Sequence, residues 1–337
     1  MFEHDEVVLE AKHVTRRFPA SDGRTLVAND DINLKFYKGK TLGLVGESGS
    51  GKSMSALAIA GLLSRKDMKK RGEILFEGVN LLDCDRKTLR KFQGNEIGMI
   101  FQEPMTALNP VKKIGWQVEE ALRLHTELSK EERKKRAIEM LEKVELHNPQ
   151  QVYEQYPHEL SGGMRQRVMI AMALACEPDI LIADEPTTAL DVTIQAQILE
   201  LMQSLQKKLG MAIIMVTHDL GVIADMCDEI IVMYGGRVCE RGTAEDIFYR
   251  PHHEYTKGLL RSIPNVDRIG EKLIPIPGTP INLLNMPKGC AFCPRCEEAM
   301  KICIEEQPPE MQMPDGHFAS CWLNVKAAME EEKGGRQ

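Results

Sequence analysis

The 337-residue chain is long enough for one large domain with an appendage or for two modest domains. Hydrophobic residues make up 43% and charged residues 28%, as in ordinary globular proteins, and the net charge of -7 gives no general attraction for nucleic acid or anionic lipid. No run approaches the roughly 20 apolar residues needed to cross a bilayer, and the acidic start lacks signal-peptide features, so we expect a cytoplasmic chain that reaches membranes only through protein partners.

Strand-like runs alternate with helical patterns as far as residue 234, which predicts an α/β fold with a largely parallel sheet covered by helices. Some of these runs are continuously apolar, as strands buried on both faces must be, so we expect them at the centre of the sheet. They begin at Thr41, Ile97, Ile180 and Ala212. The predicted strands are Val7–Val14, Ile32–Phe36, Thr41–Gly46, Ile97–Phe101, Ile180–Asp184, Ala212–Thr217 and Glu229–Tyr234.

A glycine-rich segment after the strand at Thr41–Val45 has the pattern G-x-x-x-x-G-K-[ST] and opens a helix, which is the context of a phosphate-binding loop. Its backbone N–H groups and the helix N-terminus favour phosphate oxygens. We expect Lys52 to neutralise the β- and γ-phosphate oxygens and Ser53 to bind Mg²⁺. The segment consists of Gly46, Glu47, Ser48, Gly49, Ser50, Gly51, Lys52 and Ser53.

Residues 103–166 are predominantly helical in pattern, with charged faces, and we interpret them as a helical insertion into the α/β core. Ser129 and Glu132 have the spacing of a capping box at the start of one of these helices. A second clear helix is predicted from about Val192 to Leu209, with Gly210 ending it.

The apolar strand at residues 180–184 ends in two carboxylates beside the predicted phosphate site. One carboxylate can serve a metal ion and the other a water molecule. We predict that Asp184 binds Mg²⁺, directly or through water, and that Glu185 is the general base for an attacking water.

The segment Leu160–Arg167 resembles the signature motif of ATP-binding cassette (ABC) proteins, with Met164 where glutamine is commoner, and Ala189–Asp191 resembles the D-loop of that family. The resemblance extends from about Val7 to Gly242 in the family's order and spacing. It implies an ABC-type nucleotide-binding domain of the P-loop NTPase fold, with a helical subdomain, that binds and hydrolyses ATP with Mg²⁺.

Three further residues match family positions with known roles. Gln102 resembles the Q-loop glutamine, which implies contact with Mg²⁺ and the attacking water where the core meets the helical insertion. His218 resembles the switch histidine, which implies a hydrogen bond to the γ-phosphate. Phe18 is similar in placement to the aromatic residue that stacks on adenine.

Ser161, Gly162 and Gly163 begin a helix and form a second predicted anion-binding site. In the family, this turn of one subunit closes over the ATP held by the phosphate loop of another. The resemblance therefore implies a dimer with a second ABC ATPase subunit, which we expect to be a homologue.

The segment Phe101–Pro110 resembles the site where a membrane subunit docks in oligopeptide and dipeptide importers, and residues 276–296 resemble the C-terminal region of their ATPases. This implies a peripheral protein at the cytoplasmic face of the membrane that energises peptide uptake. Its partners would be two permeases and an extracytoplasmic substrate-binding protein, with no nucleic acid.

The nine cysteines fall into two groups. We interpret Cys84, Cys176, Cys227 and Cys239 as core residues. Cys290, Cys296, Cys303 and Cys321 match the subgroup's cysteines, which implies a [4Fe–4S] cluster. Cys293 departs from that pattern, and the triplet Cys290, Cys293, Cys296 alone resembles a ferredoxin-type run in which Cys293 is a ligand. Zn²⁺ is the alternative metal.

These observations predict a nucleotide-binding domain at residues 1–250 with its helical subdomain at about 103–166, a cysteine-rich extension at 251–325 reached through a proline-rich extended connection, and a frayed polar end at 326–337. Two other functions remain open. One is an ATPase for an importer of another solute, such as nickel. The other is a soluble ABC ATPase outside transport that acts on nucleic acid or ribosomes, although the chain has one cassette and is not basic.

Overall fold

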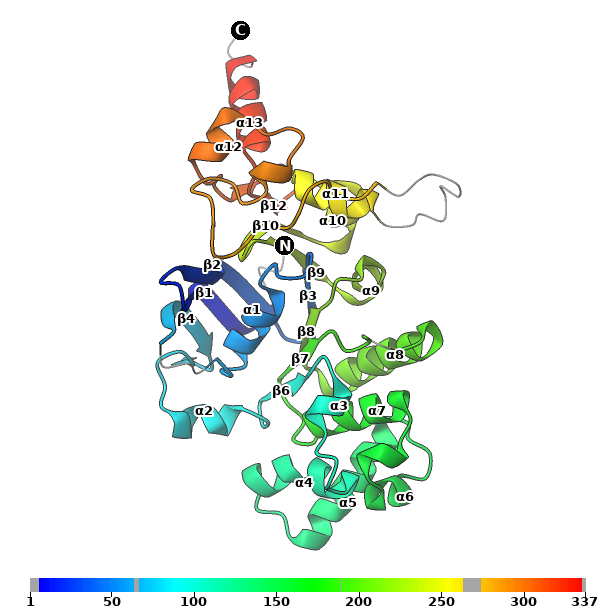
Figure 1. Ribbon diagram of the computed structural model, residues 1–337. Helices are drawn as coiled ribbons and strands as arrows, with labels where there is room; N and C mark the ends of the chain where they lie inside the picture. The colour runs from blue at the N-terminus through cyan, green and yellow to red at the C-terminus, as the bar shows by residue number, and fades with distance from the viewer. Residues whose placement is uncertain (1–5, 64–66, 189, 263–273, 335–337) are drawn as a thin grey trace.

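The computed structural model describes residues 6–63, 67–188, 190–262 and 274–334, which form two β-sheets flanked by helices and a C-terminal extension (Figure 1). Within these ranges no helix combines the length and the apolar character that a membrane crossing requires.

The larger sheet holds the parallel core of the fold. Its strands are β3 (Thr41–Val45), β6 (Ile97–Ile100), β7 (Ile180–Asp184), β8 (Ala212–Val216), β9 (Glu229–Tyr234), β10 (Arg237–Gly242), β11 (Met311–Gln312) and β12 (Phe318–Ala319). Their spatial order is β11-β12-β10-β9-β3-β8-β7-β6, and the last five of these strands are parallel. Every residue of β3, β7 and β8 is buried, which explains their continuous apolar sequences. Strand β6 was expected near the centre of the sheet, and this prediction is wrong because β6 is the edge strand. A continuously apolar sequence indicates that both faces of a strand are buried, but it does not indicate the position of the strand along the sheet.

The first two predicted strands belong to a separate antiparallel sheet, which corrects the expectation of a single, largely parallel one. This sheet consists of β1 (Val7–Pro19), β2 (Thr25–Tyr37), β4 (Lys69–Phe76) and β5 (Val79–Asn80), in the order β2-β1-β4-β5. Only residues 20–24 connect β1 to β2, and so short a connection joins antiparallel strands, whereas parallel strands need a crossover. Helix α1 (Lys52–Ile59) packs in the core shared by the two sheets.

The helices between β6 and β7 gather at one end of the molecule, away from the C-terminal extension (Figure 1). These helices are α3 (Pro104–Ala107), α4 (Ile114–His125), α5 (Lys130–Lys143), α6 (Pro149–Glu154) and α7 (Gly162–Ala173), with a 3-10 turn at Pro157–Glu159. Helix α2 (Arg86–Phe92) precedes β6. The capping box predicted at α5 is confirmed: Ser129 Oγ accepts the N–H of Glu132, and the Glu132 carboxylate accepts the N–H of Ser129. Helix α8 (Val192–Leu209) also ends as predicted, with Gly210 in the left-handed conformation at φ 69°.

The C-terminal extension differs from its sequence-based expectation in two places. Helices α9 (Leu220–Met226) and α10 (Ala244–Tyr249) precede it. The elements from residue 251 onward include α11 (Glu254–Arg261), a 3-10 turn at Cys293–Arg295, α12 (Lys301–Glu305) and α13 (Trp322–Gly334). Helix α11 lies where an extended connection was expected; it buries Tyr255 and Thr256 and is capped by His253 Nδ1, which accepts the N–H of Tyr255. Residues 326–334 continue α13 and are not frayed, whereas Pro264 and residues 335–337 lie outside the described residues.

Candidate functional site

The glycine-rich loop connects β3 to α1 and depends on its glycines for close backbone approach. Gly46 has φ 148°, and a Cβ built there would lie 2.2 Å from the carbonyl oxygen of Met233. Gly51 has φ 101°, and its Cβ would lie 2.6 Å from the carbonyl oxygen of Ala28. No side chain fits at either position, so the loop can keep this curvature only with glycine.

Lys52 lies folded into the loop, with 5% of its surface exposed. Its Nζ donates to the carbonyl oxygens of Gly46 at 2.7 Å and of Glu47 at 3.0 Å. Burial lowers the pKa of Lys52, although the carboxylates of Glu185, Asp184 and Glu47 oppose that effect. A phosphate would give this buried ammonium an anionic partner in place of neutral carbonyl groups.

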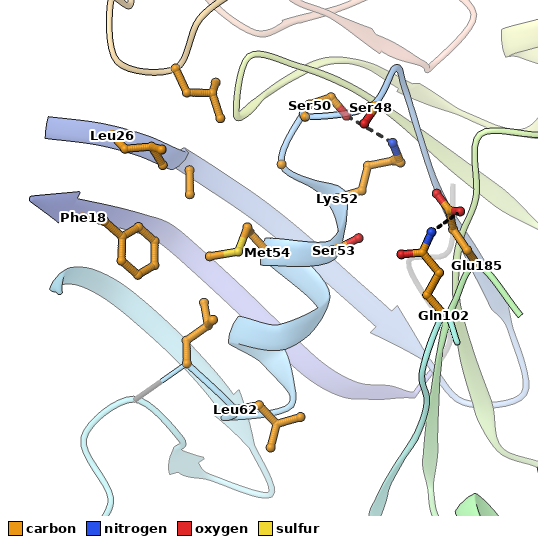
Figure 2. Close-up of a pocket in the computed structure, with 15 residues that line it drawn as sticks. Phe18, Leu26, Ser48, Ser50, Lys52, Ser53, Met54, Leu62, Gln102 and Glu185 are labelled. Carbon is orange, nitrogen blue, oxygen red and sulfur yellow. Dashed lines mark hydrogen bonds between the residues drawn. The ribbon is translucent and has the colours of Figure 1, made fainter. Parts of the chain in front are cut away.

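A cavity of about 740 Å³ lies beside the loop and has a polar and an apolar side (Figure 2). The polar side carries Lys52, Ser53, Gln102 and Glu185, and the apolar side carries the Phe18 ring (Figure 2). Such a division suits a phosphate chain at one end and a base at the other. Further residues along the cavity, which the sequence did not point to, are Leu26, Ala28, Met54, Leu62, Leu63 and Leu283.

Asp184 ends β7 against the start of α1. Its carboxylate accepts a hydrogen bond from Ser53 Oγ at 2.9 Å. Burial raises the pKa of Asp184, which is 7% exposed, and the neighbouring Glu185 carboxylate adds to that rise. The structure therefore brings together two predicted Mg²⁺ ligands whose oxygen atoms suit that ion.

Glu185 stands at the centre of a hydrogen-bonded group that joins three segments of the chain. Gln102 Nε2 and Thr188 Oγ1 each donate to its Oε2 at 2.9 Å, and His218 Nδ1 lies 3.3 Å from its Oε1. Glu185 also has φ 48°, a strained value for a residue with a side chain. Burial alone would raise the pKa of Glu185, but the hydrogen bonds from Thr188 and His218 outweigh burial and lower it.

The predicted second anion site lies away from this cavity. Ser161 caps α7 by accepting the N–H of Met164 at 3.3 Å, and both Ser161 and Gly162 are exposed. A Cβ on Gly163 would lie 3.0 Å from Ile194 Cγ2, so this turn packs against α8. None of the three predicted residues lines the cavity, whereas the D-loop residue Ala189 lies outside the described residues.

The C-terminal extension contacts the phosphate loop directly, although no pattern in the sequence predicts this contact. The N–H of Glu47 donates to Tyr255 Oη at 2.7 Å. The Glu47 carboxylate accepts from Arg295 Nη1 at 2.6 Å and Nη2 at 3.1 Å, and the Arg295 side chain is only 4% exposed. The extension also contacts β2, because the carbonyl oxygen of Leu283 accepts the N–H of Val27.

Five cysteines of the extension line one small cavity, together with Phe292 and Trp322. They are Cys290, Cys293, Cys296, Cys303 and Cys321. Burial raises the pKa of Cys290 to about 11 and that of Cys296 to about 12. Of the four cysteines assigned to the core, Cys227 and Cys239 are buried, and Cys84 and Cys176 are partly buried.

Comparisons with known families agree with this site. The ABC transporter family matches residues 29–188, and the family of oligopeptide/dipeptide transporter C-terminal regions matches residues 239–303. The oligopeptide transport ATP-binding protein OppD of Bacillus subtilis is 52% identical over 318 residues, which cover 94% of this chain and 88% of that protein. OppD of Escherichia coli is 47% identical over 321 residues, covering 95% and 94%. The dipeptide transport protein DppD of Bacillus subtilis is 48% identical over 324 residues, covering 96% of each.

Solved structures resemble the nucleotide-binding part of the chain. The ATP-binding cassette MJ0796, in a dimeric post-hydrolysis state bound to ADP and Pi, superposes with a TM-score of 0.63 at 32% identity and covers 70% of this chain and 98% of its own. The cassette cbiO1 from Clostridium perfringens gives a TM-score of 0.61 at 30% identity and covers 73% of this chain and 92% of its own. Together, these likenesses show that the chain belongs to the ABC family and, within it, to the ATP-binding proteins of oligopeptide and dipeptide transport.

Proposed function

We propose that this chain binds and hydrolyses MgATP as a motor subunit of an importer for di- or oligopeptides. The observation that supports hydrolysis best is the group around Glu185: a carboxylate held by Gln102, Thr188 and His218 beside the cavity that Lys52 enters. This is the arrangement of an oriented base next to a phosphate-binding loop.

In the proposed reaction, water attacks the γ-phosphorus in line with the leaving ADP oxygen, and Glu185 accepts the proton of that water. The lowered pKa of Glu185 keeps the carboxylate ionised and ready to accept the proton. Lys52 exchanges its contacts with the loop carbonyls for phosphate oxygens, and His218 and Gln102 hold the base and the water in place.

The described residues fit a Mg²⁺ ion next to the phosphates. Ser53 Oγ and the Asp184 carboxylate lie 2.9 Å apart, and the Gln102 amide is on the same side of the cavity. When bound, Mg²⁺ neutralises charge on the β- and γ-phosphate oxygens. The contribution of the chain is to hold these oxygen ligands where α1 and β7 meet.

The exposed turn at Ser161 and Gly162 supports a dimeric working state. Within one chain this turn lies away from the cavity, yet its helix N-terminus favours an anion. A second ABC ATPase, which we propose to be a homologue, would place its own turn over the nucleotide bound by this chain. Phe18 would pack its ring against the base.

The names of the relatives support a peptide as cargo and a membrane importer as the assembly. We propose that the partners are two permeases and an extracytoplasmic substrate-binding protein, with this chain peripheral at the cytoplasmic face. The helical stretch at 103–166 would act as the subdomain that receives the permeases, since Gln102 links its start to Glu185.

For the extension, at about 251–325, we propose a [4Fe–4S] cluster bound by Cys290, Cys296, Cys303 and Cys321. The support is the donor set, because these thiols line one cavity. Cys293 lines the same cavity and is the remaining thiol there. Four thiolates also suit a single tetrahedral Zn²⁺, which is the alternative that the metal analysis below separates from a cluster.

The function is tested by purifying the assembly from cells that express the tagged chain. Hydrophobic permeases and a second ATPase are expected to copurify, and the assembly in proteoliposomes should take up peptide only with MgATP. Copurification with ribosomes or nucleic acid, or failure to bind and split MgATP together with the second ATPase, would contradict the proposal.

The cluster is tested separately by iron and sulfide analysis and by visible absorption of anaerobically purified chain. About four irons per chain are expected, with Cys296→Ser losing them and the matched Cys293→Ser keeping them. Loss of iron in Cys293→Ser alone would transfer the ligand role to Cys293, and stoichiometric zinc without iron would replace the cluster by zinc.

A further inference from the structure

A second group of metal-ligand side chains lies outside both the nucleotide cavity and the cysteine cavity. His252 lies in the turn between α10 and α11, and Asp315 and His317 lie in the turn between β11 and β12. One ligand atom from each lies within 4.8 Å of the others, and these three residues are the only such group among the described parts of the chain. Figure 1 shows α11 and β12 in the same region above β10.

His317 is fully buried, and its two ring nitrogens differ in their surroundings. Nε2 lies 2.9 Å from Glu240 Oε1, a hydrogen bond that places the proton on Nε2 in the neutral ring. Nδ1 is buried and has no hydrogen-bond partner among the described atoms. It faces Asp315 Oδ1 at 3.4 Å. Asp315 Oδ1 also accepts the backbone N–H of His317 at 3.3 Å, and two acceptors at this separation require either a proton or a metal cation between them.

Glu240 holds His317 in this orientation. Its carboxylate is 1% exposed and accepts the backbone N–H groups of His252 and His253 as well as the His317 ring. A carboxylate that accepts the outer N–H of an imidazole is the usual support of a metal-bound histidine, because it fixes the tautomer and leaves the other nitrogen free for the metal.

We propose that His252 Nε2, the Asp315 carboxylate and His317 Nδ1 bind a divalent transition-metal ion of the zinc type. Two imidazoles and one carboxylate suit Zn²⁺ and its neighbours Co²⁺ and Ni²⁺ better than Ca²⁺ or Mg²⁺. The side chains of His252 and Asp315 are 28% and 25% exposed, so the ion can enter from solvent and water can complete its coordination.

The bound ion ties the β11–β12 turn to the turn before α11, and thereby fixes the end of the extension to the strand that carries Glu240. The proposal does not depend on the ATPase activity or on the cysteine ligands. The competing arrangement is a protonated His317 that bridges Glu240 and Asp315, with Arg250 Nε 3.8 Å from Asp315 Oδ2.

The test is a Co²⁺ titration of the purified, chelator-treated full chain, followed by visible absorption. A histidine and carboxylate site gives ligand-field bands alone, whereas cobalt on cysteines adds thiolate-to-metal charge-transfer bands, so the two sites are separated. We expect one Co²⁺ per chain without charge-transfer character, competed off by Zn²⁺.

His252→Gln and Asp315→Asn should each raise the Kd of that Co²⁺ at least about tenfold, and the exposed His147→Gln is the matched control and should not change it. Zn²⁺ should raise the Tm of the wild type and not that of the two variants. Circular dichroism checks that the variants fold. Equal Co²⁺ binding in wild type and both variants, or cobalt spectra with charge-transfer bands only, would overturn the proposal in favour of the protonated bridge.

Discussion

The Arg295 guanidinium forms a two-pronged ion pair with the Glu47 carboxylate, although the two residues are 248 positions apart in the chain. Arg295 lies between Cys293 and Cys296, and Glu47 lies in the phosphate loop. The ring of Tyr234 lies 5.8 Å from the guanidinium and its hydroxyl accepts a further hydrogen bond, so the arginine has little freedom to move. A structural change in the cysteine cavity can therefore reach the nucleotide site through the contact between Arg295 and Glu47.

Arg295→Ala should weaken ATP binding about tenfold, because the loop loses its bidentate anchor and Glu47, which is 26% exposed, loses its cation. Fluorescent-nucleotide titration measures the Kd. Arg261→Ala is the control and should leave the Kd unchanged. The Arg261 side chain is 48% exposed, against 4% for Arg295, and pairs with Glu297 at 3.9 Å in the same region. A folded Arg295→Ala chain with wild-type affinity would show that the pair is only structural.

Glu185→Gln should reduce ATP hydrolysis about 10²- to 10⁴-fold while nucleotide binding persists, because the amide keeps the shape of the side chain but cannot accept the proton. The measurements are phosphate release and ATP-dependent dimerisation with the partner ATPase on size-exclusion chromatography. The trapped dimer is expected to accumulate only in the variant. Near-normal hydrolysis would remove Glu185 from its proposed role.

Leu283→Ala should weaken binding of ATP and ADP equally, several-fold, and leave kcat unchanged, because Leu283 lines the cavity with an apolar side chain and does not belong to the hydrogen-bonded group around Glu185. Leu284→Ala is the matched control, since Leu284 is also partly buried but does not line the cavity. An equal loss of affinity in both variants would indicate a general loosening of the extension.

Glu229→Gln should stabilise the chain at neutral pH. Burial raises the pKa of Glu229 to about 6, against an ordinary value of 4.5, so the folded state holds the proton more tightly than the unfolded state. Ionisation above pH 6 therefore costs stability, on the order of 1 to 2 kcal/mol, and glutamine avoids that cost. Urea unfolding should show the gain at pH 7.5, a smaller gain as the pH falls through 6, and none below 4.5. The exposed Glu200→Gln should show no comparable gain.

Local patterns predicted the elements that carry the phosphate loop and the acidic pair, because β3, β7 and the turn at Gly46 are specified by neighbouring residues. The same holds for the capping box at Ser129 and the end of α8 at Gly210. The partition into two sheets was missed, since strand pairing depends on the length of connections as well as on apolar runs. The roles of the site residues stay predictions, although the structure brings Gln102, Glu185 and His218 into contact.

Contacts between the extension and the core could not be predicted in this way. Tyr255 and Arg295 contact a loop more than two hundred residues earlier, and Leu283 contacts Val27 of β2 across a similar separation. No periodicity or spacing in the sequence encodes such pairs. The buried group at His317 was missed for the same reason: its partners His252 and Glu240 come from separate elements, and single histidines have no local signature.

The pairing of β12 with β10 has a consequence for shortened forms of this chain. Glu240 and Arg241 pair with Ala319 and Phe318, and Ser320 N–H donates to the carbonyl oxygen of Cys239. A chain truncated after α11 would lack β12, so the backbone N–H and C=O groups of β10 would be unpaired. Such an exposed strand edge can pair with a strand of another molecule. Proteolytic loss of residues 262–337 would thus convert a folded ATPase into a species prone to aggregate, so this segment also protects solubility.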